Sequence, residues 1–434
     1  MTPLARVCEW IGRKTGTIVM IPHPIVVGNC AEQIYYGLRK ARREGKKLVL
    51  LHQYPLPWPL HYRLTNHELI DVDSDYRAFS RSSPWHVIGS AFVTVYAGIC
   101  RAILRPLRRL GYTLHADNYY PGTGDSTLWQ PKEIMPGFSW DVVAQYDWPT
   151  ELRTPIRVYL GPQKKAAAEC ERKRMGLPDD AWHVCLHVRE SSFHNDNMVE
   201  RNASIANYVE AIKEVTGRGG WVVRMGDATM TRLPPLERVI DYPFTPSKSY
   251  AMDLYLISEC RFYIGMQSGI CDVAMLFQRP IILANMANWL YPFPHGKGDI
   301  GVLKHVYSKS RQRFLSVREW IAEPFNATSY SLLGEDYVLH ENDPAELRAA
   351  VREFFDRDGN GEPTPLQCEF SERRLSRGRA LLEKPLFPNH PYGYDSNWDL
   401  HQRYRVASRL DSASGLISDD YLQKNWARDS RNQA

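Results

Sequence analysis

Short apolar segments alternate with helix-patterned segments between residues 182 and 283, and this alternation constrains the fold more than any other feature of the sequence. Each apolar segment has the length and residue types of a buried strand. The predicted strands are 183–189, 221–224, 239–240, 262–265 and 280–283, and the predicted helices are 204–216, 248–259 and 269–277. Helices placed between consecutive strands favour parallel pairing. The sequence therefore predicts an α/β fold with a parallel, doubly wound sheet.

A second α/β pattern lies near the N-terminus. Residues 17–21 and 47–51 read as strands, and residues 31–44 between them read as a helix with an apolar stripe. Gly28 and Asn29 precede that helix, where backbone N–H groups can bind an anion, although a turn that simply uses Gly and Asn explains them equally well.

A chain of 434 residues is too long for one compact core. We predict an N-terminal α/β domain over 1–160 and a C-terminal ligand-binding α/β domain over 161–340. Residues 163–174 form a charged helix that joins them, and 337–355 form one more strand and helix. The remainder, 341–434, is predicted to be a helix and a strand-poor tail that pack back on the body.

The net charge of +5 is slight for this length, so nucleic acid is not favoured as a partner. Eight scattered cysteines without metal spacing indicate a reducing compartment. The sequence lacks a signal-peptide core and a run of about 20 apolar residues, so we expect a cytoplasmic location without a membrane span. Residues 86–109 are apolar and end in four arginines. They are either a core helix with a solvated basic end or a helix on an anionic membrane surface.

The strand at 183–189 ends in a polar sequence that contains His187, Arg189 and Glu190. Ligands of open α/β sheets bind at the carboxyl ends of strands. Arginine presents a fixed fork of donors that suits phosphate, so Arg189 is predicted to hold a diphosphate. The alternative is that Arg189 forms an ordinary salt bridge at a strand end.

A turn with the same character follows the strand at 262–265. In Gly265-Met266-Gln267-Ser268-Gly269 the backbone N–H groups and the Ser268 hydroxyl face the carboxyl edge of the sheet. Next to the strand of Arg189, this turn would bind the same diphosphate.

Other motifs are missing or lie in the wrong context. Gly296, Gly298 and Gly301 have the spacing of a dinucleotide fingerprint but do not follow a strand. No P-loop or zinc-protease motif is present, so no metal site is predicted. The candidates for a general base are Glu190, Asp196, Glu200, Glu32 and Asp227, and the sequence does not choose among them.

Several of these segments together resemble a known enzyme family. They are Val26-Val27-Gly28-Asn29, His187-Val188-Arg189, Met252-Asp253-Leu254-Tyr255 and Phe262-Tyr263-Ile264-Gly265. They resemble the GDP-fucose protein O-fucosyltransferases and the α1,6-fucosyltransferases. Residues 184–285 resemble still more closely a family of bacterial glycosyltransferases of surface-polysaccharide clusters.

The resemblance implies a GT-B architecture of two facing Rossmann-like domains, with the nucleotide-sugar in the C-terminal one. It implies that Gly28, Asn29 and Arg189 contact the diphosphate, that His187 lies beside the donor, and that Asp253 contacts the nucleoside. Ser268 and Gly269 stand where the family has its phosphate turn. Val27, Arg224 and Gln267 complete the predicted donor site.

Taken together, these features predict a metal-independent, inverting glycosyltransferase without a cofactor. A GDP-linked donor is favoured, with GDP-fucose as one candidate, and the acceptor is a hydroxyl of a glycan, a lipid-linked sugar or a small molecule. Glu32 or Glu190 would deprotonate that hydroxyl while Arg189 stabilises the departing diphosphate. The product would serve surface polysaccharide or glycoconjugate biosynthesis. The alternative is a non-catalytic protein of the same fold that binds nucleotide-sugars or glycans.

Overall fold

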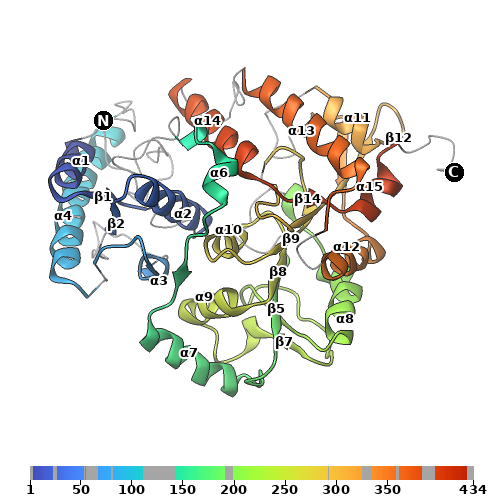
Figure 1. Cartoon of the computed structure of the whole chain (residues 1–434), viewed down its shortest axis with the longest axis horizontal. Coiled ribbons are helices and arrows are strands. Elements are labelled where there is room, and N and C mark those ends of the chain that lie inside the picture. The colour runs from blue at the N-terminus through green and yellow to red at the C-terminus, as the bar shows by residue number, and fades with distance from the viewer. Residues whose placement is uncertain are drawn as a thin grey trace. The chain divides into compact units, whose positions relative to one another are not determined.

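The chain divides into two compact units, Met1–Pro162 and Gln163–Ala434, drawn in Figure 1. A computed structural model describes residues 3–22, 27–52, 54, 67–79, 82–110, 143–190, 199–291, 293–324, 334–357, 361–383 and 396–427.

The first unit is built on two parallel strands, β1 (Thr17–Met20) and β2 (Lys47–Leu50), connected through helix α2 (Val27–Arg43). Three of the four residues of each strand are buried. The predicted strand–helix–strand pattern is present, but α2 begins four residues earlier than the predicted residue 31. Gly28 and Asn29 therefore lie in the first turn of the helix and not in the turn before it.

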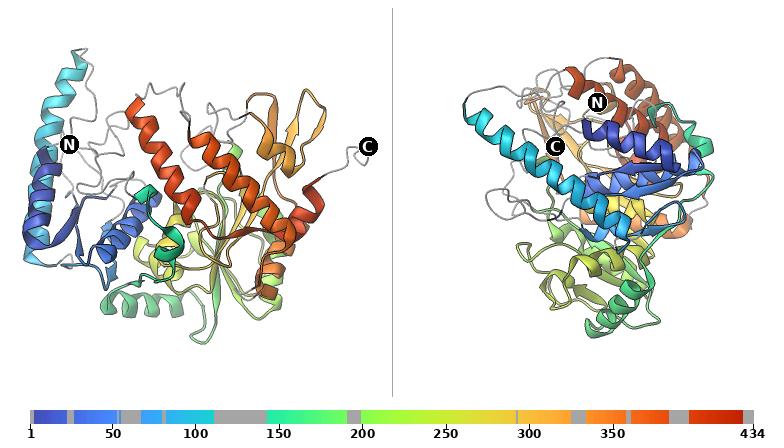
Figure 2. Two further views of the ribbon diagram at one scale, coloured as in Figure 1. Left: turned by 45° about the horizontal axis from the view of Figure 1, so that its top comes forward. Right: turned by 90° about the vertical axis from the view of Figure 1, so that its left-hand side faces the viewer.

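Two further helices, α1 (Pro3–Thr15) and α4 (Pro84–Arg109), cover this sheet and lie side by side in Figure 2. Cys8 of α1 and Val93 of α4 share one buried cluster with Val19, Ile21, Val49 and Leu51 of the two strand segments. The helix predicted within 86–109 forms and starts two residues earlier. The remaining elements of the unit are short: α3 (His67–Ile70), β3 (Asp73–Ser74), α6 (Trp148–Leu152) and β4 (Val158–Tyr159), with β3 and β4 antiparallel.

The second unit contains a seven-stranded sheet in the order β14-β10-β9-β8-β5-β6-β7, in which every neighbouring pair is parallel. The strands are β5 (His183–His187), β6 (Trp221–Arg224), β7 (Val239–Asp241), β8 (Phe262–Gly265), β9 (Ile281–Met286), β10 (Ile300–Leu303) and β14 (Leu416–Ile417). Burial on both faces explains their nearly continuous apolar sequences. The predicted α/β class with parallel sheets is confirmed.

Helices connect these strands much as the sequence predicts. They are α8 (Val209–Gly217), α9 (Tyr250–Glu259) and α10 (Gly269–Leu276), with short 3₁₀ turns at Val199–Arg201, Ile205–Tyr208 and Tyr242–Phe244. Helix α7 (Pro162–Arg174) precedes β5. The first part of the predicted helix 204–216 is thus a 3₁₀ turn capped by the Ser204 side chain.

The strand and helix predicted at 337–355 both form, as β13 (Tyr337–His340) and α12 (Pro344–Arg357). However, β13 pairs antiparallel with β11 (His305–Ser308), which also pairs with β12 (Arg313–Phe314), in a separate three-stranded sheet. Alternate residues of β13 are exposed, as is usual for an antiparallel strand with one face toward solvent.

The C-terminal segment packs on the second unit. Its helices are α13 (Pro365–Leu382), α14 (Ser396–Ser412) and α15 (Asp419–Asn425), and α11 (Val317–Ala322) precedes them. The tail also supplies β14, whose Leu416 and Ile417 pair with Ile300 and Gly301 of β10. A tail predicted to be poor in strands therefore completes the edge of the main sheet.

Candidate functional site

The strand order of the second unit reverses between β5 and β8. The chain runs outward from β5 through β6 to β7, and then returns to the other side of β5 as β8. The helices that follow two such neighbouring strands lie on opposite faces, which leaves room for a ligand at their carboxyl ends. The candidate site is this edge, where β5 ends at His187 and β8 ends at its register partner Gly265.

His187 and Ser268 are in contact at this edge. The Ser268 Oγ atom lies 3.2 Å from His187 Nδ1. Ser268 occupies the N-cap position of α10, but its side chain accepts no hydrogen bond from that helix. Burial, and secondarily the positive charge of Arg224, lower the pKa of His187 to about 3, so its imidazole is neutral near pH 7.

Arg189 is buried two residues beyond the end of β5. Its Nη1 donates a hydrogen bond to Asn202 Oδ1 at 2.7 Å, and its carbonyl accepts from Ala203 N at 3.0 Å. The buried Nδ2 of Asn202 has no hydrogen-bond partner in the described part of the chain. A donor left in that state is a binding opportunity for an acceptor oxygen of a ligand.

Two more basic side chains, those of Lys304 and Arg201, donate hydrogen bonds at this edge. Lys304, which follows β10, donates from Nζ to Asn202 O at 2.6 Å, and burial lowers its pKa to about 8. Arg201 donates from Nε and Nη2 to the carbonyl of Gln267 at 3.1 and 2.6 Å. The guanidinium group of Arg201 therefore connects the loop after β5 to the turn after β8.

Gln267 and Arg224, both predicted to bind the donor, are directed into the protein. Gln267 Nε2 donates to Tyr291 O at 2.9 Å. Arg224 is fully buried and donates from Nη1 to Asp241 Oδ1 at 3.0 Å. In this conformation the side chain of Arg224 is enclosed by the protein, and its positive charge is the second cause of the low pKa of His187.

Glu190, a predicted base, lies next to Arg224. Its Oε1 is 3.8 Å from Arg224 Nη2, and its Oε2 accepts from Thr231 N at 2.6 Å. These two contacts hold the carboxylate in place and leave acceptor sites on its oxygens.

Asp253, predicted to contact the nucleoside, lies in the first turn of α9. Both of its oxygens are 2.5 Å from Lys248 Nζ. Burial raises the pKa of Asp253 against the opposite effect of Lys248. Lys248 also makes a lesser contribution to the low pKa of His187.

The other predicted residues belong to the first unit. Val27, Gly28 and Asn29 form the start of α2, where the helix dipole favours an anion, and Glu32 is buried one turn later. Two buried histidines that the sequence did not single out are in contact beyond the carboxyl end of β2. His52 follows this strand, and His86 belongs to α4. His86 Nε2, from α4, lies 3.1 Å from His52 Nδ1, and Ser90 Oγ lies 3.4 Å from that same atom.

The glycine pattern at 296–301 forms a turn that runs into β10, which contains Gly301. Asp299 is buried in this turn and accepts from Gly296 N at 2.7 Å and Ile281 N at 2.8 Å. No helix follows it, so the dinucleotide motif is excluded. Within the described ranges, no three His, Cys, Asp or Glu side chains gather in a way that could hold a metal ion.

Asp196, one of the candidate bases, belongs to 191–198 and lies outside the described residues.

The site residues that sequence reasoning missed are Arg201, Asn202 and Lys304. The first two follow a loop without periodicity, and Lys304 follows a strand that was not predicted. A basic residue directly after an apolar run, as in Leu303-Lys304, is the signal that could have identified the last of them.

Comparisons with known proteins show similarity to glycosyltransferases. No protein-family model and no curated protein matches the sequence. Among solved structures, a family 9 glycosyl transferase from Veillonella parvula aligns over 78% of this chain and 97% of that chain, with 11% identity and a TM-score of 0.42. The E. coli ADP-heptose LPS heptosyltransferase II aligns over 79% of this chain and 99% of that chain, with 12% identity and a TM-score of 0.38. Similarity this weak assigns no activity, and the resemblance to fucosyltransferases stays a prediction.

Proposed function

We propose that the chain is a glycosyltransferase whose second unit binds the diphosphate of a nucleotide-sugar at the carboxyl edge between β5 and β8. The observation that carries this proposal is the contact of His187 with Ser268 at the point where the strand order reverses, at 3.2 Å. Arg189, Arg201 and Lys304 lie on the loops of that same edge. The edge thus combines a helix N-terminus with three cations, which is the chemistry that a diphosphate requires.

Arg189 would act on the leaving group. The acceptor oxygen attacks the anomeric carbon, the bond from that carbon to the diphosphate oxygen breaks, and the electron pair leaves with the nucleoside diphosphate. Negative charge grows on the diphosphate during this step, and a fixed guanidinium nearby lowers its energy. A single displacement of this kind inverts the anomeric configuration. NMR of the first product formed tests this through its anomeric coupling constant.

The proton of the acceptor hydroxyl needs a base. Glu32, buried in α2, and Glu190, which accepts from Thr231 N, remain the two candidates. Separate Glu32→Gln and Glu190→Gln variants distinguish them, because loss of the base lowers transfer to an acceptor while donor binding persists.

We further propose that transfer needs no metal, because the three cations and the N-terminus of α10 can neutralise the diphosphate. The expected result is an unchanged transfer rate after chelation. A requirement for Mg²⁺ or Mn²⁺ would contradict this part of the proposal.

A nucleotide-sugar-binding protein without catalysis is the second candidate function, because the described edge explains donor binding better than proton transfer. A thermal-shift panel of ADP, GDP, UDP and CMP tests binding first, with GDP favoured by the family resemblance. Release of the nucleotide from the corresponding sugar donor then tests catalysis. Binding without release supports the second candidate, and the absence of any nucleotide-dependent shift rejects both.

A further inference from the structure

The outer surface of α1 and α4 in the first unit is unusually apolar. The described residues include fifteen large apolar side chains that are exposed, and eleven of them lie here: three on α1, seven on α4, and Leu110 directly after α4. Trp85 is 68% exposed, Ile88 61% and Val95 63%. So much apolar surface in one place usually marks a binding surface.

The exposed residues of α4 form one continuous stripe. Trp85, Ile88, Phe92, Val95, Ile99 and Ile103 are spaced three or four residues apart, which places them on the same side of a helix. The opposite side of α4 carries the buried residues His86, Ser90 and Val93. The sheet therefore covers one side of the helix and leaves the apolar stripe on the outside.

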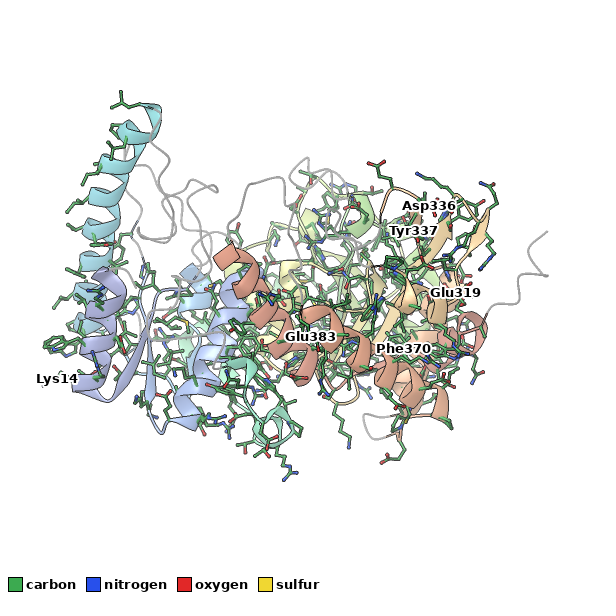
Figure 3. The ribbon with its side chains drawn as sticks, turned by 90° about the horizontal axis from the view of Figure 1, so that it is seen from above. Lys14, Glu319, Asp336, Tyr337, Phe370 and Glu383 are labelled. Carbon is green, nitrogen blue, oxygen red and sulfur yellow. The ribbon has the colours of Figure 1, made fainter. Side chains whose placement is uncertain are left out.

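Helix α1 continues this surface. Val7, Trp10 and Ile11 are exposed, whereas Cys8 packs into the cluster beneath. Figures 1 and 2 show α1 and α4 side by side at one end of the first unit. Lys14, labelled in Figure 3, lies at the outer edge of this end. We call the exposed residues of α1 and α4 the α1–α4 face.

The charge of the two helices is strongly one-sided. Their sequences contain seven basic residues and only one acidic residue, Glu9. The basic residues are Arg6, Arg13, Lys14, Arg101, Arg105, Arg108 and Arg109. The whole chain, in contrast, has 54 basic and 49 acidic residues, so the excess is local to these helices.

We propose that the α1–α4 face binds the surface of an anionic lipid bilayer. Apolar side chains would enter the boundary between headgroups and acyl chains, and the exposed Arg6, Arg13 and Lys14 of α1 would contact anionic headgroups. Trp10 and Trp85 suit this boundary because indole combines an apolar ring with a hydrogen-bond donor. No described helix is long and apolar enough to cross a bilayer, so the contact is peripheral.

The charge argues against a second copy of the chain as the occupant. Two copies joined through this face would bring Arg6, Arg13 and Lys14 of both copies together beside an apolar contact, and like charges across an interface are costly. An anionic membrane removes that repulsion. The proposal does not depend on the donor site, since it rests on residues of the first unit alone.

Vesicle flotation of the full chain tests the proposal. Phosphatidylcholine vesicles that contain phosphatidylglycerol should bind the protein, while phosphatidylcholine alone or high salt should reduce binding. Ile88→Gln combined with Val95→Gln should weaken binding by at least about tenfold, because two apolar side chains no longer leave water. The matched control, Tyr250→Gln with Val338→Gln, changes two exposed apolar residues of the second unit and should bind as the wild type does.

A charge variant gives an independent result. Changing Arg6, Arg13 and Lys14 to Gln should weaken binding roughly fivefold for each residue. Arg174, Lys213 and Arg352, exposed in the second unit, provide the matched control. Circular dichroism and size-exclusion chromatography check the fold and the oligomeric state of each variant. Absence of wild-type binding, unchanged binding by the Ile88/Val95 variant, or a dimer that this variant abolishes would overturn the proposal.

Discussion

The side chains of Ser268 and His187 meet at 3.2 Å, from neighbouring parallel strands that lie far apart in the sequence. Ser268 is the N-cap residue of α10, but its hydroxyl contacts His187 and does not accept the usual hydrogen bond from a backbone N–H of that helix. The N-terminus of α10 consequently keeps its positive end without a side-chain cap from Ser268.

Replacement of Ser268 tests whether this end binds the diphosphate. Ser268→Asp introduces a favourable N-cap residue, so we expect the melting temperature to be unchanged or higher. The same carboxylate repels a diphosphate, so nucleotide affinity should fall by at least about tenfold. Thermal denaturation measures the melting temperature and calorimetric titration the affinity, each against Ser268→Ala, for which a smaller loss of affinity is expected. An Asp variant that binds nucleotide normally would place the nucleotide elsewhere.

Replacement of Arg189 tests the leaving-group role. Arg189→Ala should lower turnover by roughly 10²-fold or more, because a preorganised charge partner is lost. Arg189→Lys retains the charge without the planar fork and should show an intermediate rate. Arg352→Ala serves as the control, since Arg352 is exposed and pairs with Glu214 in the same unit. Turnover of Arg189→Ala at the wild-type rate would refute the assignment.

The buried histidines predict a pH dependence of stability. Burial lowers the pKa of His183 to about 4 and that of His187 to about 3, in each case as the largest effect. In the unfolded chain both titrate near 6.5, so between about 6.5 and 4 the unfolded state binds protons that the folded state does not. The free energy of unfolding should therefore fall as the pH is lowered through this range, by up to about 1.4 kcal/mol per pH unit for each histidine.

His183→Gln isolates one of these contributions. His183 Nε2 lies 2.9 Å from Leu256 O, and a glutamine amide can donate to the same oxygen without titrating. Urea denaturation at several pH values should give a shallower slope for this variant than for the wild type. Equal slopes would show that His183 is not a source of the dependence.

Lys304 predicts a pH dependence of nucleotide binding. Its pKa is lowered to about 8 because the ammonium group is buried. As the pH rises through about 8 the amine loses its charge, so nucleotide affinity should decrease over that range. Lys304→Met, which keeps the length of the side chain, should bind more weakly and show no such step. A wild-type protein with constant affinity from pH 7 to 9 would contradict a role for this charge.

Much of the second unit could be predicted from the sequence because its strands are short apolar runs. Burial on both faces forces that pattern on β5, β6, β8 and β9, and it is visible without any knowledge of tertiary contacts. The pairing partner of a strand is not visible in this way. For this reason the sequence did not predict that β13 would pair in a separate antiparallel sheet. Strand β14 has only two residues and was too short to recognise.

The position of a candidate residue was predictable where it lies close behind a recognisable strand, as Arg189 lies two residues after β5 and Ser268 three residues after β8. Arg201 and Asn202 come from a loop whose position depends on long-range hydrogen bonds to Gln267 and Arg189. The burial of Arg224 likewise depends on Asp241 from the neighbouring strand. Such contacts depend on residues distant in sequence, so periodicity and local motifs do not show them.

The position of β14 at the end of the main sheet also affects when this unit can fold during synthesis. Leu416 pairs with Ile300, so the ribosome must add more than a hundred residues before the edge strand β10 gains its neighbour. Until then the backbone groups of β10 on that side are open to other chains. A nascent second unit should accordingly depend on chaperones over this interval. Slower translation of the tail should increase aggregation of the second unit.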